Sequence, residues 1–120
     1  MFELCIKGDI ASAHFLPGYE GKCKDLHGHT WQIEVFIVND KLDKVGLVAD
    51  FAILKKQLKD FLSTIDHICL NDLPYFKKVN PSTENIAKYV YDNFGKVIAP
   101  LKLSKVCVWE SETASVTYYE

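Results

Sequence analysis

Apolar and polar residues alternate in two stretches near the start of the chain, and this period of two is typical of half-buried β-strands. The first stretch covers residues 2–14, where Phe2, Leu4 and Ile6 alternate with Glu3, Cys5 and Lys7. We expect a bulge in it at Gly8-Asp9. The second stretch covers about 27–38, and its odd positions are His27, His29, Trp31, Ile33, Val35 and Ile37. Residues 16–26 between them hold Pro17, Gly18 and Gly21 and are predicted to form a loop.

The spacing of apolar residues changes to three and four in the middle of the chain, which predicts helices. Asp50 is a good N-cap for a helix that begins at Phe51 and is closed by Asp66-His67. Its apolar face consists of Phe51, Leu54, Leu58, Phe61, Leu62 and Ile65. Residues 68–81 are expected to be irregular, with breaks at Pro74 and Pro81. A second helix, capped by Ser82 or Thr83, carries Ile86, Val90 and Phe94 and ends before Pro100.

Two β-rich segments, 103–110 and 114–119, follow the second helix. The order of elements is therefore ββααββ, which predicts an α+β fold: a four-stranded antiparallel sheet with both helices on one face. With 120 residues the chain is expected to form a single domain over 1–120.

Composition and charge exclude several classes of function. Hydrophobic residues make up 48% of the chain and the formal net charge is -2, so no basic surface for nucleic acid is expected. We see no apolar stretch long enough for a membrane span and no secretion signal, and we expect a cytoplasmic protein. Its four cysteines, Cys5, Cys23, Cys69 and Cys107, have no metal-finger spacing and are expected to be thiols.

Three histidines form a candidate metal site. His27 and His29 lie two apart on a predicted strand, so both imidazoles project from the same face. His14 ends the preceding strand and is the expected third ligand, and three imidazoles with one open position are typical of catalytic zinc. The alternative is a closed structural site in which the thiolate of Cys23 is the fourth ligand.

The motifs around these histidines resemble the 6-pyruvoyl-tetrahydropterin synthase superfamily. They are Ala11-Ser12-Ala13-His14, the segment from Cys23 to His29, Asp66 to Asp72, Asn80 to Asn85, and Trp109-Glu110-Ser111. The three residues between Cys23 and His27 resemble the spacing in bacterial 6-carboxy-5,6,7,8-tetrahydropterin synthases. One departure is Ser12, which stands where the family has alanine.

The resemblance implies a T-fold and a zinc-dependent lyase of queuosine biosynthesis. The expected reaction converts 7,8-dihydroneopterin triphosphate to 6-carboxytetrahydropterin, acetaldehyde and triphosphate. One alternative is the 6-pyruvoyl reaction, which retains the side chain, and another is a zinc-stabilised oligomeric module without catalytic activity. The resemblance also implies a homo-oligomer, expected to be a hexamer built as a dimer of trimers.

The resemblance assigns roles to six further residues. Cys23, Asp66 and His67 are expected to handle protons, while Glu110, Thr83 and Glu84 are expected to bind the pterin. Without the resemblance, Asp66-His67 is equally a helix end and Ser82-Thr83-Glu84 a helix start.

Overall fold

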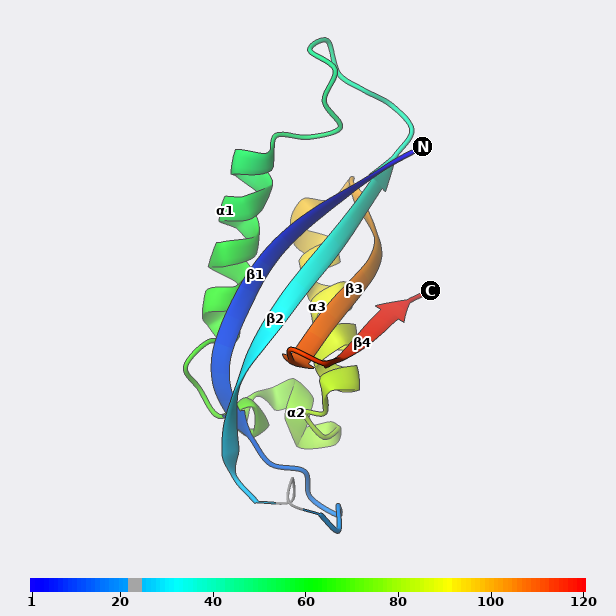
Figure 1. Cartoon of the computed structure of the whole chain (residues 1–120). Helices are drawn as coiled ribbons and strands as arrows, with labels where there is room; N and C mark the ends of the chain where they lie inside the picture. The colour runs from blue at the N-terminus through cyan, green and yellow to red at the C-terminus, as the bar shows by residue number, and fades with distance from the viewer. Residues whose placement is uncertain (22–24) are drawn as a thin grey trace.

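The computed structural model describes residues 1–21 and 25–120, and its main element is an antiparallel sheet with the strand order β1-β2-β3-β4 (Figure 1). The strands are β1 (Phe2–His14), β2 (His27–Asn39), β3 (Lys102–Ser111) and β4 (Ala114–Tyr119). The helices are α1 (Phe51–Leu62), α2 (Pro74–Lys78) and α3 (Thr83–Ile98), with 3-10 turns at Ser63–Ile65 and Leu70–Asp72. The predicted order of strands and helices is therefore confirmed.

The helices α1 and α3 cover one face of the sheet, with α1 over β1 and α3 over β3 and β4 (Figure 1). The inward side chains of the strands pack against the apolar faces of both helices to form the core. Its largest fully buried members include Trp31, Phe94, Ile10, Ile33, Leu54 and Leu58. Period-two burial in the strands and period-3.6 burial in the helices produce this two-layer arrangement.

Side-chain caps begin both long helices, as the sequence predicts. The Asp50 carboxylate accepts a hydrogen bond from the Ala52 amide at 2.8 Å at the start of α1. Of the two residues proposed to cap α3, Ser82 is the cap, and its hydroxyl accepts from the Asn85 amide at 3.2 Å. Thr83 is the first residue of the helix and is buried.

Two sequence-based expectations about local structure are wrong. The segment 68–81 is not wholly irregular, because Pro74 starts the short helix α2 at a position where a missing amide hydrogen costs nothing. Gly8 and Asp9 form no bulge and pair regularly with Ile33 and Gln32. Gly8 faces α1 instead, and a Cβ there would lie 2.6 Å from Leu62 Cδ1, so the glycine lets the helix approach the strand closely.

The segment after α1 runs along the outer edge of β1 near His14. The His67 amide donates to the carbonyl oxygen of Ala11 at 2.7 Å, and the Ala13 amide donates to that of Ile68 at 2.9 Å. This contact places the Asp66-His67 pair beside the strand end that carries the histidine. Within the described part of the chain, no helix is both long and apolar enough to cross a membrane.

Candidate metal centre

The pairing of β1 with β2 brings three histidines together. His14 lies directly opposite His27 in the antiparallel register, and His29 lies opposite Ser12, two residues away on the same face. One ligand nitrogen from each of the three imidazoles lies within 4.8 Å of the others. The three residues proposed from the sequence as metal ligands are thus neighbours in the structure.

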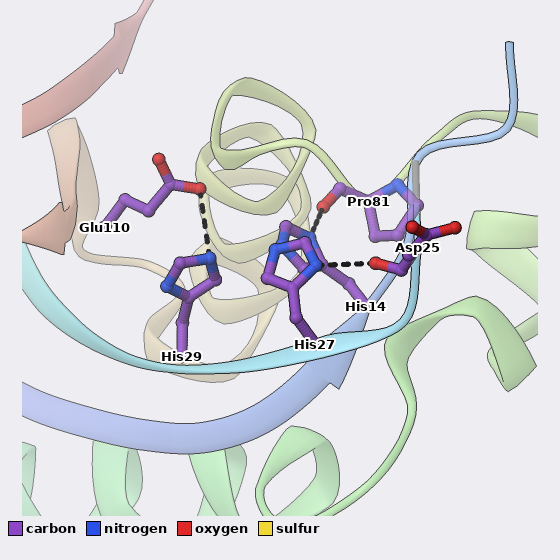
Figure 2. Close-up of polar contacts among 6 residues, drawn as sticks. All are labelled: His14, Asp25, His27, His29, Pro81 and Glu110. Carbon is purple, nitrogen blue, oxygen red and sulfur yellow. Dashed lines mark hydrogen bonds and ion pairs between the residues drawn. The ribbon is translucent and has the colours of Figure 1, made fainter. Parts of the chain in front are cut away.

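Backbone carbonyl groups fix the orientation of two of these rings. Nδ1 of His14 bonds to the carbonyl oxygen of Pro81, and Nδ1 of His27 to that of Asp25, both at 2.7 Å (Figure 2). A carbonyl oxygen only accepts, so each Nδ1 carries the proton and donates. In the neutral form of each ring, Nε2 then presents its lone pair, which is the form that binds metal.

The lone pairs of these rings point at one another in a way that suits a shared cation. Nε2 of His14 lies 2.9 Å from Nε2 of His27. Two lone pairs at this distance repel each other unless a positive charge lies between them. Nε2 of His29 is buried and has no hydrogen-bond partner among the described residues. Zinc–nitrogen bonds of about 2.1 Å allow bound nitrogens to be at most about 4.2 Å apart, so small side-chain rotations are enough to bind one ion.

Burial and aromatic packing keep this site ready to bind metal. His14 is 1% exposed, and this burial lowers the pKa of its imidazole below the ordinary value. The neutral ring therefore persists to lower pH. Trp31 contacts His14 and His29 through its ring, with centroids 4.9 Å and 5.2 Å apart, and restricts their rotation from the core side.

A hollow of about 300 Å³ opens beside His14, and we call it the Glu110 hollow. It is lined by His14, Leu16, Tyr19, Ser82, Thr83, Glu84, Glu110, Ala114, Ser115 and Val116. A Glu110 carboxylate oxygen lies 3.6 Å from Nε2 of His29, too far for a hydrogen bond (Figure 2). The hydroxyl of Thr83 is buried and lacks a hydrogen-bond partner within the described residues, whereas Glu84 is exposed. The hollow thus combines two carboxylates with an unused hydroxyl.

Asp66 and His67 form a pair that is separate from the three histidines. Nδ1 of His67 lies 2.9 Å from the Asp66 carboxylate, and the His67 side chain is 79% exposed. The Ala11 amide, at 2.8 Å, and the His67 ring together lower the pKa of the Asp66 carboxyl below its ordinary value. His67 lines a second hollow, of about 580 Å³, that His29 also borders. His67 has a positive φ of 56°, a left-handed backbone conformation that is uncommon for residues other than glycine.

Cys23 lies outside the described residues, so its expected role as a proton-handling thiol near the metal stays a prediction. Sequence reasoning missed the Pro81 and Asp25 carbonyl groups, because every residue carries a carbonyl and nothing in the residue type marks it. Trp31 lies at an odd position of the predicted strand, as His27 and His29 do, so the sequence places all three on one face. This shared face was a signal for the contact of Trp31 with the site.

Known proteins share this fold and much of this sequence. The family model described as 6-pyruvoyl tetrahydropterin synthase matches residues 3–120. The 6-carboxy-5,6,7,8-tetrahydropterin synthase of Bacillus subtilis is 35% identical over 112 residues, covering 89% of this chain and 75% of the relative. The human 6-pyruvoyl tetrahydrobiopterin synthase is 36% identical over 102 residues, covering 82% and 70%. The structure of Caenorhabditis elegans 6-pyruvoyl tetrahydropterin synthase matches with a TM-score of 0.88 at 27% identity, covering 99% and 95%.

Proposed function

The chain belongs to the 6-pyruvoyl tetrahydropterin synthase family, and on that premise we propose that it is a zinc-dependent carbon–carbon lyase of the 6-carboxytetrahydropterin synthase type. It would convert 7,8-dihydroneopterin triphosphate and water to 6-carboxy-5,6,7,8-tetrahydropterin, acetaldehyde and triphosphate, as a step of queuosine biosynthesis. The observation that carries this proposal is the convergence of three imidazoles beside a hollow that holds carboxylates. Two of their lone pairs face each other, and the buried Nε2 of His29 has no partner among the described residues.

His14, His27 and His29 are the proposed metal ligands. Zinc held by these residues would supply Lewis-acid chemistry to the side-chain hydroxyl groups of the substrate. The Pro81 and Asp25 carbonyls would keep two of the rings in the ligating tautomer, and Trp31 would exclude water from one side. The family match extends over these residues, which supports the choice of ligands.

Cys23, Asp66 and His67 are the proposed proton-handling residues. The thiolate of Cys23 or the imidazole of His67 would take a proton from a side-chain hydroxyl of the substrate. The bond from the carbon that carries this hydroxyl to the carbon attached to the ring then breaks, the hydroxyl oxygen becomes the new carbonyl oxygen, and the pterin ring accepts the electron pair. Triphosphate leaves the terminal carbon in a separate elimination. Asp66 would orient His67 and stabilise its protonated form, since its carboxylate lies 2.9 Å from Nδ1.

Glu110 and Thr83 are the proposed contacts for the edge of the pterin ring, with Glu84 at the rim of the hollow. A carboxylate accepts paired hydrogen bonds from a ring N–H and an exocyclic amine, which the pterin offers side by side. The buried hydroxyl of Thr83 has no partner among the described residues and is available to the same ring. These contacts would hold the reacting side chain of the substrate at the metal. Such positioning matters because a displacement of about 1 Å costs on the order of a hundredfold in rate.

Identification of the reaction products tests this function against its nearest alternative. Bacterial 6-carboxy enzymes support the main reading, and because a 6-pyruvoyl enzyme is also 36% identical to this chain, the products are the direct test of the alternative. We expect acetaldehyde and triphosphate in equal amounts when the purified zinc-loaded protein is given 7,8-dihydroneopterin triphosphate. Acetaldehyde is measured with coupled alcohol dehydrogenase. Triphosphate without acetaldehyde would assign the chain to the 6-pyruvoyl reaction, and release of neither would contradict both.

We further propose that the domain 1–120 works in the cytoplasm as a homo-oligomer, a hexamer made of two trimers. The edge strands β1 and β4 end the sheet on either side, and the 67–69 segment contacts only the His14 end of β1. The rest of each edge offers backbone groups that a second copy could pair with. Light scattering after size exclusion should give about six times the mass of one chain, and a mass of one chain would contradict the assembly.

A further inference from the structure

The segment that follows β1 is held in a defined conformation beside the Glu110 hollow. Asn71 is 7% exposed, and its side chain accepts from the Phe15 amide at 3.0 Å and donates to the Phe15 carbonyl oxygen at 2.9 Å. The Asn80 side chain donates to the carbonyl oxygen of Pro17 at 2.9 Å. The side-chain amides of Asn71 and Asn80, which are far from this segment in sequence, therefore fix the backbone of residues 15–17.

A tight turn then directs Tyr19 to the rim of the hollow. The Tyr19 amide donates to the Leu16 carbonyl oxygen at 3.2 Å, with Pro17 and Gly18 at the two central positions. Gly18 has a φ of +87°, so this is a turn of type II, in which proline and glycine are the favoured residues. Gly21 leaves room for the Tyr19 ring, since a Cβ at that position would overlap Cε1 of the ring.

Tyr19 is 52% exposed although most of its surface is apolar. The hollow that it lines also holds Thr83 and Glu110, which suit the polar edge of a flat heterocycle. Such a heterocycle has two apolar faces as well, and none of the residues proposed so far to bind it has an aromatic side chain. An aromatic ring is the side chain that fits a face best, because offset stacking adds to the burial of apolar area.

We propose that Tyr19 stacks on the face of the pterin ring and determines how tightly the Glu110 hollow holds it. This inference rests on the proposed function, because it takes a pterin as the occupant. Pro17, Gly18, Asn71 and Asn80 act as positioning residues that hold the Tyr19 ring in place before the ligand arrives. A ring held in place loses little freedom on binding, and this favours affinity.

Binding of neopterin, a flat fluorescent pterin, tests the role of Tyr19 in the zinc-loaded protein. Loss of a stacked aromatic ring costs roughly 1–3 kcal/mol for nucleobases, which corresponds to about 5- to 150-fold in the dissociation constant. Tyr19→Ala should weaken neopterin binding by an amount in this range, with zinc content equal to that of the unaltered chain. Tyr19→Phe should bind within about threefold of the unaltered chain, because it keeps the ring. In turnover, Tyr19→Ala should raise KM more than it lowers kcat, as expected for a contact made equally in ground and transition states.

Phe51→Ala is the matched control, since Phe51 is 50% exposed at the start of α1 and does not line the hollow. It should leave neopterin binding unchanged. Tyr19→Leu keeps apolar bulk without the aromatic face and should fold but bind weakly, which covers the case in which the alanine variant fails to fold.

Three results would overturn the inference while leaving the proposed function in place. They are unchanged binding in Tyr19→Ala, binding by Tyr19→Leu equal to that of the unaltered chain, and a loss in Tyr19→Phe as large as in Tyr19→Ala. Absence of neopterin binding by the unaltered chain would instead overturn the proposed substrate class, and the role of Tyr19 with it.

Discussion

The hydroxyl of Ser12 donates a hydrogen bond to the carbonyl oxygen of Ile65 at 2.6 Å. The Ser12 hydroxyl oxygen in turn accepts a hydrogen bond from the Ile68 amide at 3.3 Å, and Ser12 is 7% exposed. Ser12 lies opposite His29 in the β1–β2 register. Ser12, which stands where the family has alanine, therefore links Ile65 and Ile68, on either side of Asp66-His67, to β1. This strand carries the proposed metal ligand His14.

Replacement of Ser12 by alanine should lower the free energy of unfolding by about 1–3 kcal/mol, because it leaves the Ile65 carbonyl and the Ile68 amide without this partner. Urea denaturation of the metal-free protein measures the change. Ser63→Ala is the matched control, since the Ser63 hydroxyl also donates to a backbone carbonyl but is exposed. Equal losses in the two variants would contradict the structural role of the Ser12 hydroxyl.

Replacement of Asp66 by asparagine should make stability less dependent on acid pH. The Ala11 amide and then His67 lower the pKa of Asp66 below its ordinary value of 3.8. The folded state therefore favours the ionised carboxylate, and the stabilisation is present above the ordinary pKa and lost as pH falls through the folded pKa. Asparagine keeps an acceptor for Ala11 without the charge, so the variant should be less stable at neutral pH and approach the unaltered chain in acid.

Urea denaturation midpoints between about pH 2 and pH 7, measured with a chelator present, test this pH dependence. Asp60→Asn is the control for loss of one surface carboxylate, since Asp60 pairs only with the exposed Lys56 side chain among the described residues. Parallel curves for Asp66→Asn and the unaltered chain would show that the Asp66 charge does not stabilise the fold.

Replacement of His27 by alanine should remove zinc and turnover together. Loss of a partner in the outer shell of a metal site costs 10- to 100-fold in affinity, so loss of a ligand should cost more than about 100-fold. Zinc per chain after dialysis against a weak chelator measures the effect. His67→Ala is the control, because His67 lies outside the group of three and should leave zinc in place. Full zinc occupancy in the His27 variant would rule out the proposed site.

Replacement of Cys23 by alanine separates a catalytic thiol from a structural ligand. Three histidines suffice for a catalytic zinc site, so zinc content should be retained while turnover falls by ~10²–10⁴. Cobalt substitution gives a second measurement, because a thiolate ligand adds a charge-transfer absorption band. If zinc is lost with the thiol, and the band is present in the unaltered chain, the site is a closed structural one.

The local pattern of the sequence determined the strands, the two long helices and the shared face of two of the three proposed metal ligands. Strict alternation predicted β1 and β2, and spacing of three and four predicted α1 and α3. The two-residue spacing of His27 and His29 is enough to place both imidazoles on one face, because successive strand residues point to opposite sides. Asp50 and Ser82 marked the helix starts, since their side chains bond to free amides there.

Only the tertiary structure decided which groups complete the site. The cross-strand pairing of His14 with His27 depends on a register that the whole β1–β2 interface sets, and no local pattern specifies it. Gly8 looks like a bulge in the sequence, but the approach of Leu62 explains it. The Pro81 carbonyl that orients His14 lies 67 residues away in sequence. Backbone carbonyls are the same in every residue, so their role depends on where the folded chain places them, and the sequence carries no sign of it.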